Sequence, residues 1–229
     1  MSDSEPYLRA TNLSHSYSAT PVLQPFELTV NPGEIVSIRG PNGSGKSTLL
    51  LCLSGLLRPT TGDVAICGHD IYADEADAKR CLAFVPDVPR FYLELTAWEH
   101  LRFVALAHQA DAEFEPQAEA LLKEFGLWAV RDQFPHQFSR GMRLKLGFVL
   151  AIIRPFKLLL LDEPTSALDA AATELVREHV LAQRRAGASC VVVTHDPVLS
   201  EAVADRTFWL RDGVFASGES DSDTEADGE

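Results

Sequence analysis

A glycine-rich loop between an apolar strand and a helix limits the folds open to this chain more than any other feature. Residues 40–47 read Gly-Pro-Asn-Gly-Ser-Gly-Lys-Ser and match the pattern G-x-x-x-x-G-K-[ST] in full. We expect a strand at 34–38 before the loop and a helix after it that runs to about Leu57. Backbone N–H groups in such a loop converge on phosphate oxygens, and the start of the helix adds partial positive charge. The loop therefore predicts phosphate binding, with Lys46 on the β- and γ-phosphates and the Ser47 hydroxyl on Mg²⁺.

Short apolar runs alternate with helical periods along the rest of the chain. The expected strands cover residues 7–13, 26–30, 64–66, 82–85, 158–161 and 190–193. Helical periodicity is expected within 96–122, after Ser139 and at about 170–185. Continuous apolar strands that alternate with helices are typical of a parallel sheet covered on both faces. The mostly helical block at about 88–153 is interpreted as an insertion into that α/β core.

Two carboxylates close a leucine-rich strand. Asp162 and Glu163 follow the run at 158–161, and the ligand of an open α/β sheet lies at the carboxyl ends of its strands. A buried carboxylate pair is costly without a cation, so Asp162 is a candidate ligand of Mg²⁺ and Glu163 a candidate base that polarises water. His195 ends the next strand. A lone strand-end histidine is more often structural, but beside these groups a contact with the γ-phosphate is favoured.

The net charge limits the ligands expected for this protein, and the cysteines indicate its compartment. The formal net charge is −13, which disfavours binding to the phosphate backbone of nucleic acid. We interpret residues 218–229 as an acidic disordered tail, with partner binding as the alternative. The four cysteines show no metal-ligand spacing and indicate a reducing compartment. We find no signal peptide, and no apolar run approaches the ~20 residues that a membrane span needs.

Smaller motifs follow one another in a recognisable order. They are Tyr17, the glycine-rich loop, Pro86-Asp87, Phe138-Ser139-Arg140-Gly141-Met142, Leu-Leu-Leu-Leu-Asp-Glu-Pro, Ser166-Ala167-Leu168-Asp169 and Thr194-His195-Asp196. With this series the chain resembles ABC-type ATPases over residues 7–217. The resemblance implies one α/β domain at 1–217 with a RecA-like parallel sheet and an N-terminal antiparallel β portion. The core would cover 7–87 and 154–217, and an inserted helical subdomain would cover 88–153.

The same resemblance implies roles for individual residues. Nucleotide contacts are implied for Tyr17, which stacks on adenine, and for Gly40, Pro41, Asn42, Gly43, Ser44, Gly45, Lys46, Ser47 and Thr48. Catalysis is implied for Glu163, His195 and Lys46, and Mg²⁺ binding for Ser47, Asp162 and Asp87. The segment Ser139, Arg140, Gly141 and Met142 corresponds to the signature motif, which contacts ATP held by the opposite subunit, and Ser166 and Asp169 to the D-loop. Taken singly, Tyr17 could be an ordinary strand aromatic and Ser139 a helix N-cap; their joint order favours the functional roles.

Three positions depart from the family pattern. Arg140 stands where the family usually has glycine, and Met142 where it has glutamine. The resulting Ser-Arg-Gly-Met form is similar to ATPases that pair with exporter permeases of the ABC-2 class. Asp87 stands where a glutamine usually helps to bind Mg²⁺. Two interpretations of Asp87 stay open: a structural turn before Pro89, and a position close to the metal.

The resemblance implies an ATP-hydrolysing subunit that binds ATP and Mg²⁺ and dimerises head to tail, as a homodimer or with a related ATPase. The subunit would lie at the cytoplasmic face of the membrane. It would power transport, with export favoured, through a separate transmembrane permease. Phe91 and Tyr92 are expected either in the core or in a groove for a permease helix. Two rivals are a catalytically silent regulatory partner and a soluble ABC protein that acts on ribosomes or DNA. The intact Glu163 and His195 disfavour the first, and the acidic charge disfavours the second.

Overall fold

The fold is built on two β-sheets. This computed structural model describes residues 5–18, 20–108 and 114–217. The antiparallel sheet contains β1 (Leu8–Tyr17), β2 (Thr20–Val30), β4 (Thr61–Ile66) and β5 (His69–Asp70) in the order β2-β1-β4-β5. The core sheet contains β3 (Ile35–Arg39), β6 (Leu82–Val85), β7 (Leu158–Asp162), β8 (Ser189–Val193), β9 (Arg206–Arg211) and β10 (Val214–Ser217) in the order β10-β9-β3-β8-β7-β6. This plan confirms the predicted α/β fold with its N-terminal antiparallel portion. The acidic tail expected at 218–229 lies outside the described residues.

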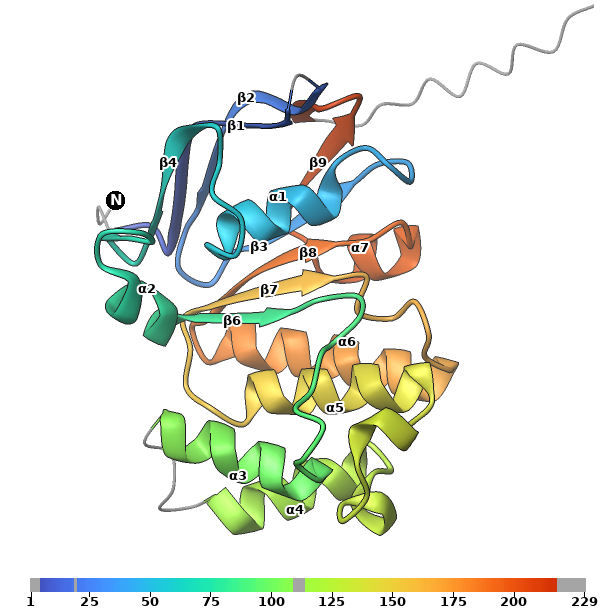
Figure 1. Cartoon of the computed structure of the whole chain (residues 1–229). Helices are drawn as coiled ribbons and strands as arrows, with labels where there is room; N and C mark the ends of the chain where they lie inside the picture. Colours follow the sequence, from blue (N-terminus) through green and yellow to red (C-terminus); the bar gives the residue numbers. More distant parts are fainter. Residues whose placement is uncertain (1–4, 19, 109–113, 218–229) are drawn as a thin grey trace, which may run out of the picture.

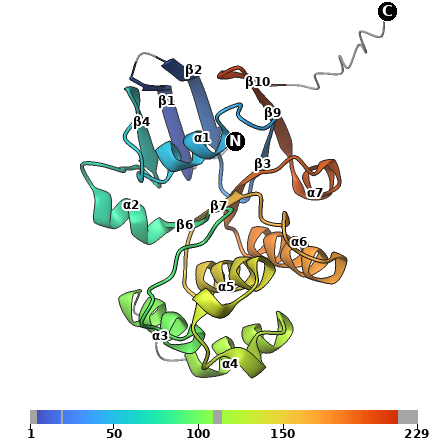
Figure 2. The same ribbon diagram turned by 45° about the vertical axis from the view of Figure 1, so that its right-hand side comes forward.

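Helices cover both faces of the core sheet. They are α1 (Lys46–Leu53), α2 (Glu75–Cys81), α3 (Ala97–Ala107), α4 (Phe114–Glu124), α5 (Arg140–Ile152), α6 (Ala170–Arg185) and α7 (Pro197–Val203), with 3₁₀ turns η1 (Trp128–Val130) and η2 (Pro135–Gln137). Helix α1 lies between the two sheets, and α5 and α6 lie on the opposite face of the core sheet (Figures 1 and 2). Helices α3 and α4 lie beyond α5 (Figure 1). Among the described residues, none of these helices is long and apolar enough to cross a membrane.

The leucines of β7 show why this strand is covered on both sides. Leu158 and Leu160 belong to the apolar cluster around α1, whereas Leu159 and Leu161 belong to the cluster formed with α3, α4, α5 and α6. Successive side chains of a strand point to opposite faces, so four consecutive leucines fill two cores at once. All four leucines are buried. The strands β3, β8, β7 and β6 run parallel, and therefore their carboxyl ends lie along one edge.

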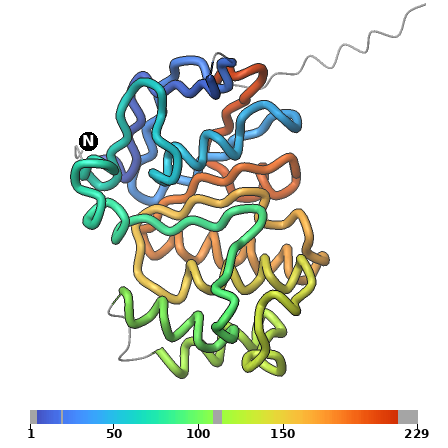
Figure 3. Tube along the Cα trace, viewed as in Figure 1, coloured from blue at the N-terminus to red at the C-terminus, as the bar shows by residue number. Residues whose placement is uncertain are grey.

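The inserted helical elements α3 to α5 lie inside the block expected at 88–153, and the domain boundaries stay a prediction. Figure 3 shows the chain after β6 running from the sheet edge down to α3. The predicted helical stretch within 96–122 is two helices, α3 and α4.

The expectation that the first helix runs to Leu57 was wrong, because α1 ends at Leu53. Ser54 is its C-cap, and Gly55 follows with φ of 72°, a left-handed conformation that ends helices and suits glycine. Helix α2 and the hairpin of β9 and β10 were not anticipated. Helix α2 buries only Ala78, so it has no apolar stripe that the sequence pattern could reveal.

Candidate nucleotide-binding and catalytic site

Four neighbouring strands of the core sheet end at the same edge, and each delivers one predicted site segment. The phosphate loop (residues 40–47) follows β3, and His195 follows β8. Glu163 follows β7, and Asp87 lies two residues beyond β6. Because β3, β8, β7 and β6 are adjacent and parallel, segments far apart in the sequence meet where an open α/β sheet binds its ligand.

A cavity of about 320 Å³ lies at this edge. It is lined by Val22, Asn42, Gly43, Gly45, Lys46, Ser47, Thr48, Asp87, Asp162 and Glu163. The structure thus brings the predicted phosphate loop, the carboxylate pair and Asp87 together. Val22 also lines the cavity, and nothing in the sequence pattern singles it out.

Tyr17 is not among the residues that line this cavity. It ends β1 with half of its surface exposed, and its ring meets the His15 ring edge to face at 4.7 Å between centroids. An exposed aromatic ring has the form that base stacking requires. The adenine contact implied for Tyr17 stays a prediction.

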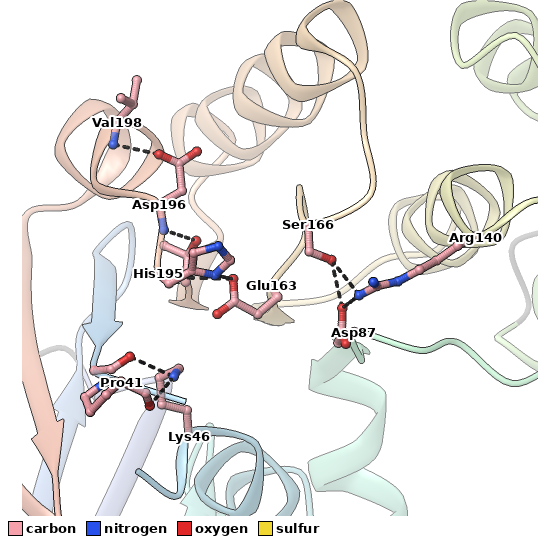
Figure 4. Close-up of polar contacts among 11 residues, drawn as sticks. Pro41, Lys46, Asp87, Arg140, Glu163, Ser166, His195, Asp196 and Val198 are labelled. Atoms are coloured by element: carbon pink, nitrogen blue, oxygen red, sulfur yellow. Dashed lines mark hydrogen bonds and ion pairs between the residues drawn. The ribbon is translucent and has the colours of Figure 1, made fainter. Parts of the chain in front are cut away.

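Lys46 and Ser44 are two buried polar residues of the phosphate loop. The Lys46 side chain is buried, and its Nζ donates hydrogen bonds to the carbonyl oxygens of Gly40 at 2.8 Å and Pro41 at 2.9 Å (Figure 4). Ser44 Oγ is buried without a hydrogen-bond partner among the described residues. A buried hydroxyl without a partner is unfavourable, and a phosphate oxygen would satisfy it. These groups fit the phosphates of a nucleotide.

Asp162 is a buried carboxylate, 5% exposed. Burial is the main cause that raises its pKa, and the charges of Asp87 and Glu163 add to the rise. A hydrogen bond from Ser47 and the charge of Lys46 oppose it. A cation beside Asp162 would stabilise the charged carboxylate, and carboxylate and hydroxyl oxygens are ligands that Mg²⁺ accepts.

The described residues do not by themselves form a complete metal-binding site. No group of three or more His, Cys, Asp or Glu side chains there could hold a metal ion. Mg²⁺ usually keeps several waters and binds through one or two carboxylates together with substrate phosphates. The pair of Asp162 and Ser47 fits that manner of binding.

Glu163 and His195 lie against each other. Glu163 Oε2 accepts hydrogen bonds from His195 Nδ1 at 2.8 Å and from the His195 backbone N–H at 3.3 Å (Figure 4). The Glu163 side chain is 14% exposed and the His195 side chain 65% exposed. Glu163 has φ of 45°, a left-handed conformation that non-glycine residues rarely adopt. From this backbone conformation the Glu163 carboxylate contacts His195, and Glu163 also lines the cavity.

The predicted signature segment begins α5, and none of its residues lines the cavity of its own chain. Ser139 is the exposed N-cap, and its Oγ accepts a hydrogen bond from the Met142 backbone N–H at 3.2 Å. Arg140 Nη2 is 2.7 Å from Asp87 Oδ1, and the Ser166 hydroxyl donates to the same oxygen at 2.8 Å (Figure 4). This pairing of Asp87 was not anticipated by either sequence interpretation. Asp169 is the N-cap of α6 and accepts from Ala172 N–H at 2.8 Å.

Known proteins resemble this chain in sequence and in fold. The sequence profile of ABC transporters matches residues 23–166. The SkfA peptide export ATP-binding protein SkfE of Bacillus subtilis (strain 168) is 32% identical over 207 residues, which are 90% of this chain and 86% of the relative. The chain belongs to the ABC transporter ATP-binding family. This ATPase binds ATP, as predicted.

A solved relative of this ABC ATPase agrees with it in fold, and the names of its sequence relatives describe different directions of transport. A solved ATP-binding subunit of an ABC transporter superposes with a TM-score of 0.86 at 33% identity, covering 92% of this chain and 90% of that chain. The spermidine/putrescine import ATP-binding protein PotA of Aggregatibacter actinomycetemcomitans is 31% identical over 93% of this chain and 57% of its own length. The relatives therefore include both exporters and importers.

Proposed function

We propose that this ATPase works as a head-to-tail dimer that hydrolyses ATP and powers export through a separate membrane permease. The loop amides and Lys46 would hold the phosphates, Glu163 would orient the attacking water, and His195 would hold the γ-phosphate. Mg²⁺ held by oxygens of Asp162 and Ser47 would neutralise developing charge on the phosphates. The dimer would be of identical chains or of this chain with a related ATPase, at the cytoplasmic face of the membrane.

The position of the signature segment carries the dimer proposal. Ser139 and Gly141 start α5 outside the residues that line the 320 Å³ cavity of their own chain. The start of a helix attracts anions, and Ser139 adds a hydroxyl there. A second chain related by a two-fold axis could bring its own Ser139 and Gly141 to this cavity, in a closed symmetry that is common among oligomers.

Export rests on the Ser-Arg-Gly-Met form of residues 139–142, which is similar to partners of ABC-2-type permeases. SkfE is named for peptide export and PotA for import, so the relatives favour neither direction. If the export proposal holds, tagged ATPase purified from membranes should co-purify with a multi-span permease of the ABC-2 class. Co-purification with ribosomes, and no membrane protein, would contradict the transport proposal.

An apolar groove of about 810 Å³ supports a membrane partner. It lies between α1, the chain after β6, and helices α3 and α5, and it is lined by Ser47, Leu51, Leu56, Phe84, Pro86, Asp87, Val88, Pro89, Arg90, Phe91, Val104, His108, Gly147, Leu150, Ala151, Arg154 and Asp162. Leu56 and Val88 in this lining are more than half exposed. A groove with exposed apolar side chains is a candidate site for a partner helix. The groove also reaches Ser47 and Asp162, so a permease helix bound there would lie beside the nucleotide.

The two aromatics expected to mark this groove differ in position. Phe91 lines the groove and packs on the apolar core, whereas Tyr92 is 58% exposed next to it. We expect the Phe91→Ala, Tyr92→Ala double variant to reduce permease binding at least ~5-fold, because buried aromatic anchors dominate interfaces. Co-purification with the permease measures this, with Val198→Ala, an exposed apolar residue on α7, as the control. Unchanged permease binding and coupling would leave only the core role.

Asp87 gives a prediction about the metal. It lines the cavity together with Asp162, so it remains a candidate for a water-mediated contact with Mg²⁺. Asp87→Gln is expected to weaken the Mg²⁺ dependence of ATP hydrolysis while turnover stays within about tenfold, because positioning changes and the base does not. A Mg²⁺ titration of ATPase activity measures this. A curve that superimposes on the wild type would rule out the metal role.

A further inference from the structure

Arg140 occupies the first position of α5, where a positive charge is poorly placed. The start of a helix carries partial positive charge, and the first turn of α5 contains no acidic residue to offset it. The guanidinium instead reaches across to Asp87, which is 53 residues earlier in the chain. A group outside the helix therefore compensates the charge of Arg140.

Three side chains form a closed set of hydrogen bonds there. Arg140 Nη2 donates to Asp87 Oδ1 at 2.7 Å and to Ser166 Oγ at 3.1 Å, and Ser166 Oγ donates to the same Asp87 oxygen at 2.8 Å. Figure 4 shows the three side chains converging from three separate segments. Arg140 Nη2 and the Ser166 hydroxyl both donate in this arrangement, and one carboxylate oxygen receives two of the bonds.

Close approaches of the backbone hold α5 against the same two loops. A Cβ atom on Gly141 would lie 2.6 Å from the Ala167 carbonyl oxygen, next to Ser166. A Cβ atom on Gly147 would lie 2.7 Å from Pro89 Cγ, two residues beyond Asp87. Such distances leave no room for a side chain, so close packing at these two glycines accompanies the ion pair.

The two loops also belong to the nucleotide site. Asp87 lines the cavity with Lys46 and Asp162, and the Ser166 backbone N–H donates to the Glu163 carbonyl oxygen at 3.1 Å. A change at the cavity edge therefore reaches Asp87 or Ser166 directly. Arg140 is the next residue after Ser139, which the proposed dimer presents to the partner's ATP.

We infer that Arg140, Asp87 and Ser166 form a clamp within one subunit, and that Arg140 is a positioning residue. The clamp fixes the start of α5 relative to the cavity edge of its own chain. Its effect on hydrolysis rests on the proposed head-to-tail function: Ser139 and Gly141 face the partner's ATP while the Arg140 side chain stays bound to its own subunit. Each signature segment would thereby be positioned by the nucleotide site of the chain that carries it.

A simple surface ion pair is the competing explanation. The Arg140 side chain is 53% exposed and that of Asp87 34% exposed, and isolated pairs with such exposure contribute little to stability. The two explanations differ in what a reversed charge at residue 140 does. If the ion pair contributes little, helix electrostatics dominates, and Arg140→Asp is expected to stabilise the first turn of α5. The clamp predicts the opposite, because two carboxylates would then face each other.

Hydrogen exchange of the nucleotide-free full chain tests this with a double-mutant cycle. The amides of Met142 and Arg143 report the first turn, since they bond to Ser139 Oγ and Ser139 O. Arg140→Asp should quicken their exchange by about threefold to tenfold in the wild type, and should leave it unchanged or slow it in the Asp87→Asn background. Equal changes in both backgrounds would overturn the clamp.

Two further variants complete the test. Arg80→Asp removes the partner of Asp77 on the exposed helix α2, so it should leave exchange of Met142 and Arg143 unchanged in the wild type and in the Asp87→Asn background alike. Arg140→Lys keeps the positive charge and should leave exchange of Met142 and Arg143 within about twofold of the wild type.

An ATPase assay separates positioning from binding. Arg140→Gln should lower kcat about tenfold while KM for ATP stays within about twofold, and Arg140→Lys should recover most of that loss. An unchanged kcat would refute the positioning role. If the wild-type chain neither dimerises nor hydrolyses ATP, the proposed function fails, and the exchange cycle still decides whether the clamp exists.

Discussion

Glu163→Gln is expected to lower ATP turnover by ~10²–10⁴ while ATP binding survives, in the range for a lost general base. Glutamine keeps the size of the side chain and an oxygen that can accept the 2.8 Å hydrogen bond from His195 Nδ1. It removes the negative charge that orients and polarises water in the proposed mechanism. Because the bound ATP is then not consumed, a closed dimer should accumulate. Size-exclusion chromatography with ATP and a steady-state ATPase assay measure the two effects.

Glu174→Gln on α6 is the matched control for this change. Glu174 is exposed and pairs with Arg177 on the same helix, so its loss should leave both ATP hydrolysis and elution volume unchanged. Hydrolysis at the wild-type rate in Glu163→Gln would show that Glu163 is not the base.

A mixture of two inactive variants should regain activity. Ser139→Arg places a bulky side chain at the start of α5, outside the cavity of its own chain, so it should spare ATP binding by the monomer and block the closed dimer. Lys46→Ala removes the buried ammonium of the phosphate loop. A heterodimer of the two keeps one complete site, and random pairing in a two-fold dimer should restore about a quarter of wild-type ATPase activity.

Ser139→Thr controls for the lost helix cap. Threonine retains a hydroxyl that can accept from Met142 N–H, so it separates capping, which contributes about 1 kcal/mol, from the block to dimer closure. A mixture with no more activity than its separate components would contradict the head-to-tail arrangement.

Sequence periodicity predicted the strands and helices whose buried side chains recur at regular spacing. The strand at 82–85 and the helix at 170–185 were predicted with the bounds that the structure has, because each carries an uninterrupted apolar pattern. Helix α7 was missed because it is short and begins at Pro197, directly after the predicted His195 segment. Short elements are fixed by tertiary contacts, which a local pattern does not contain.

The meeting of the site residues was predictable only in part. The carboxyl ends of parallel strands share one edge, so the phosphate loop, Glu163 and His195 could be expected together. The bond between Arg140 and Asp87 could not, because it depends on how α5 docks on the loop after β6. Both residues are departures from the family pattern, and the structure places them in contact with each other.

The left-handed backbone at Glu163 has a consequence for engineering. Glycine adopts φ of 45° without the steric penalty that a Cβ atom imposes, so Glu163→Gly should relieve about 1 kcal/mol of strain. The same change deletes the carboxylate. Thermostability screening that ignores turnover would therefore favour variants that lack the proposed catalytic carboxylate, and directed evolution of the protein needs a paired selection for hydrolysis.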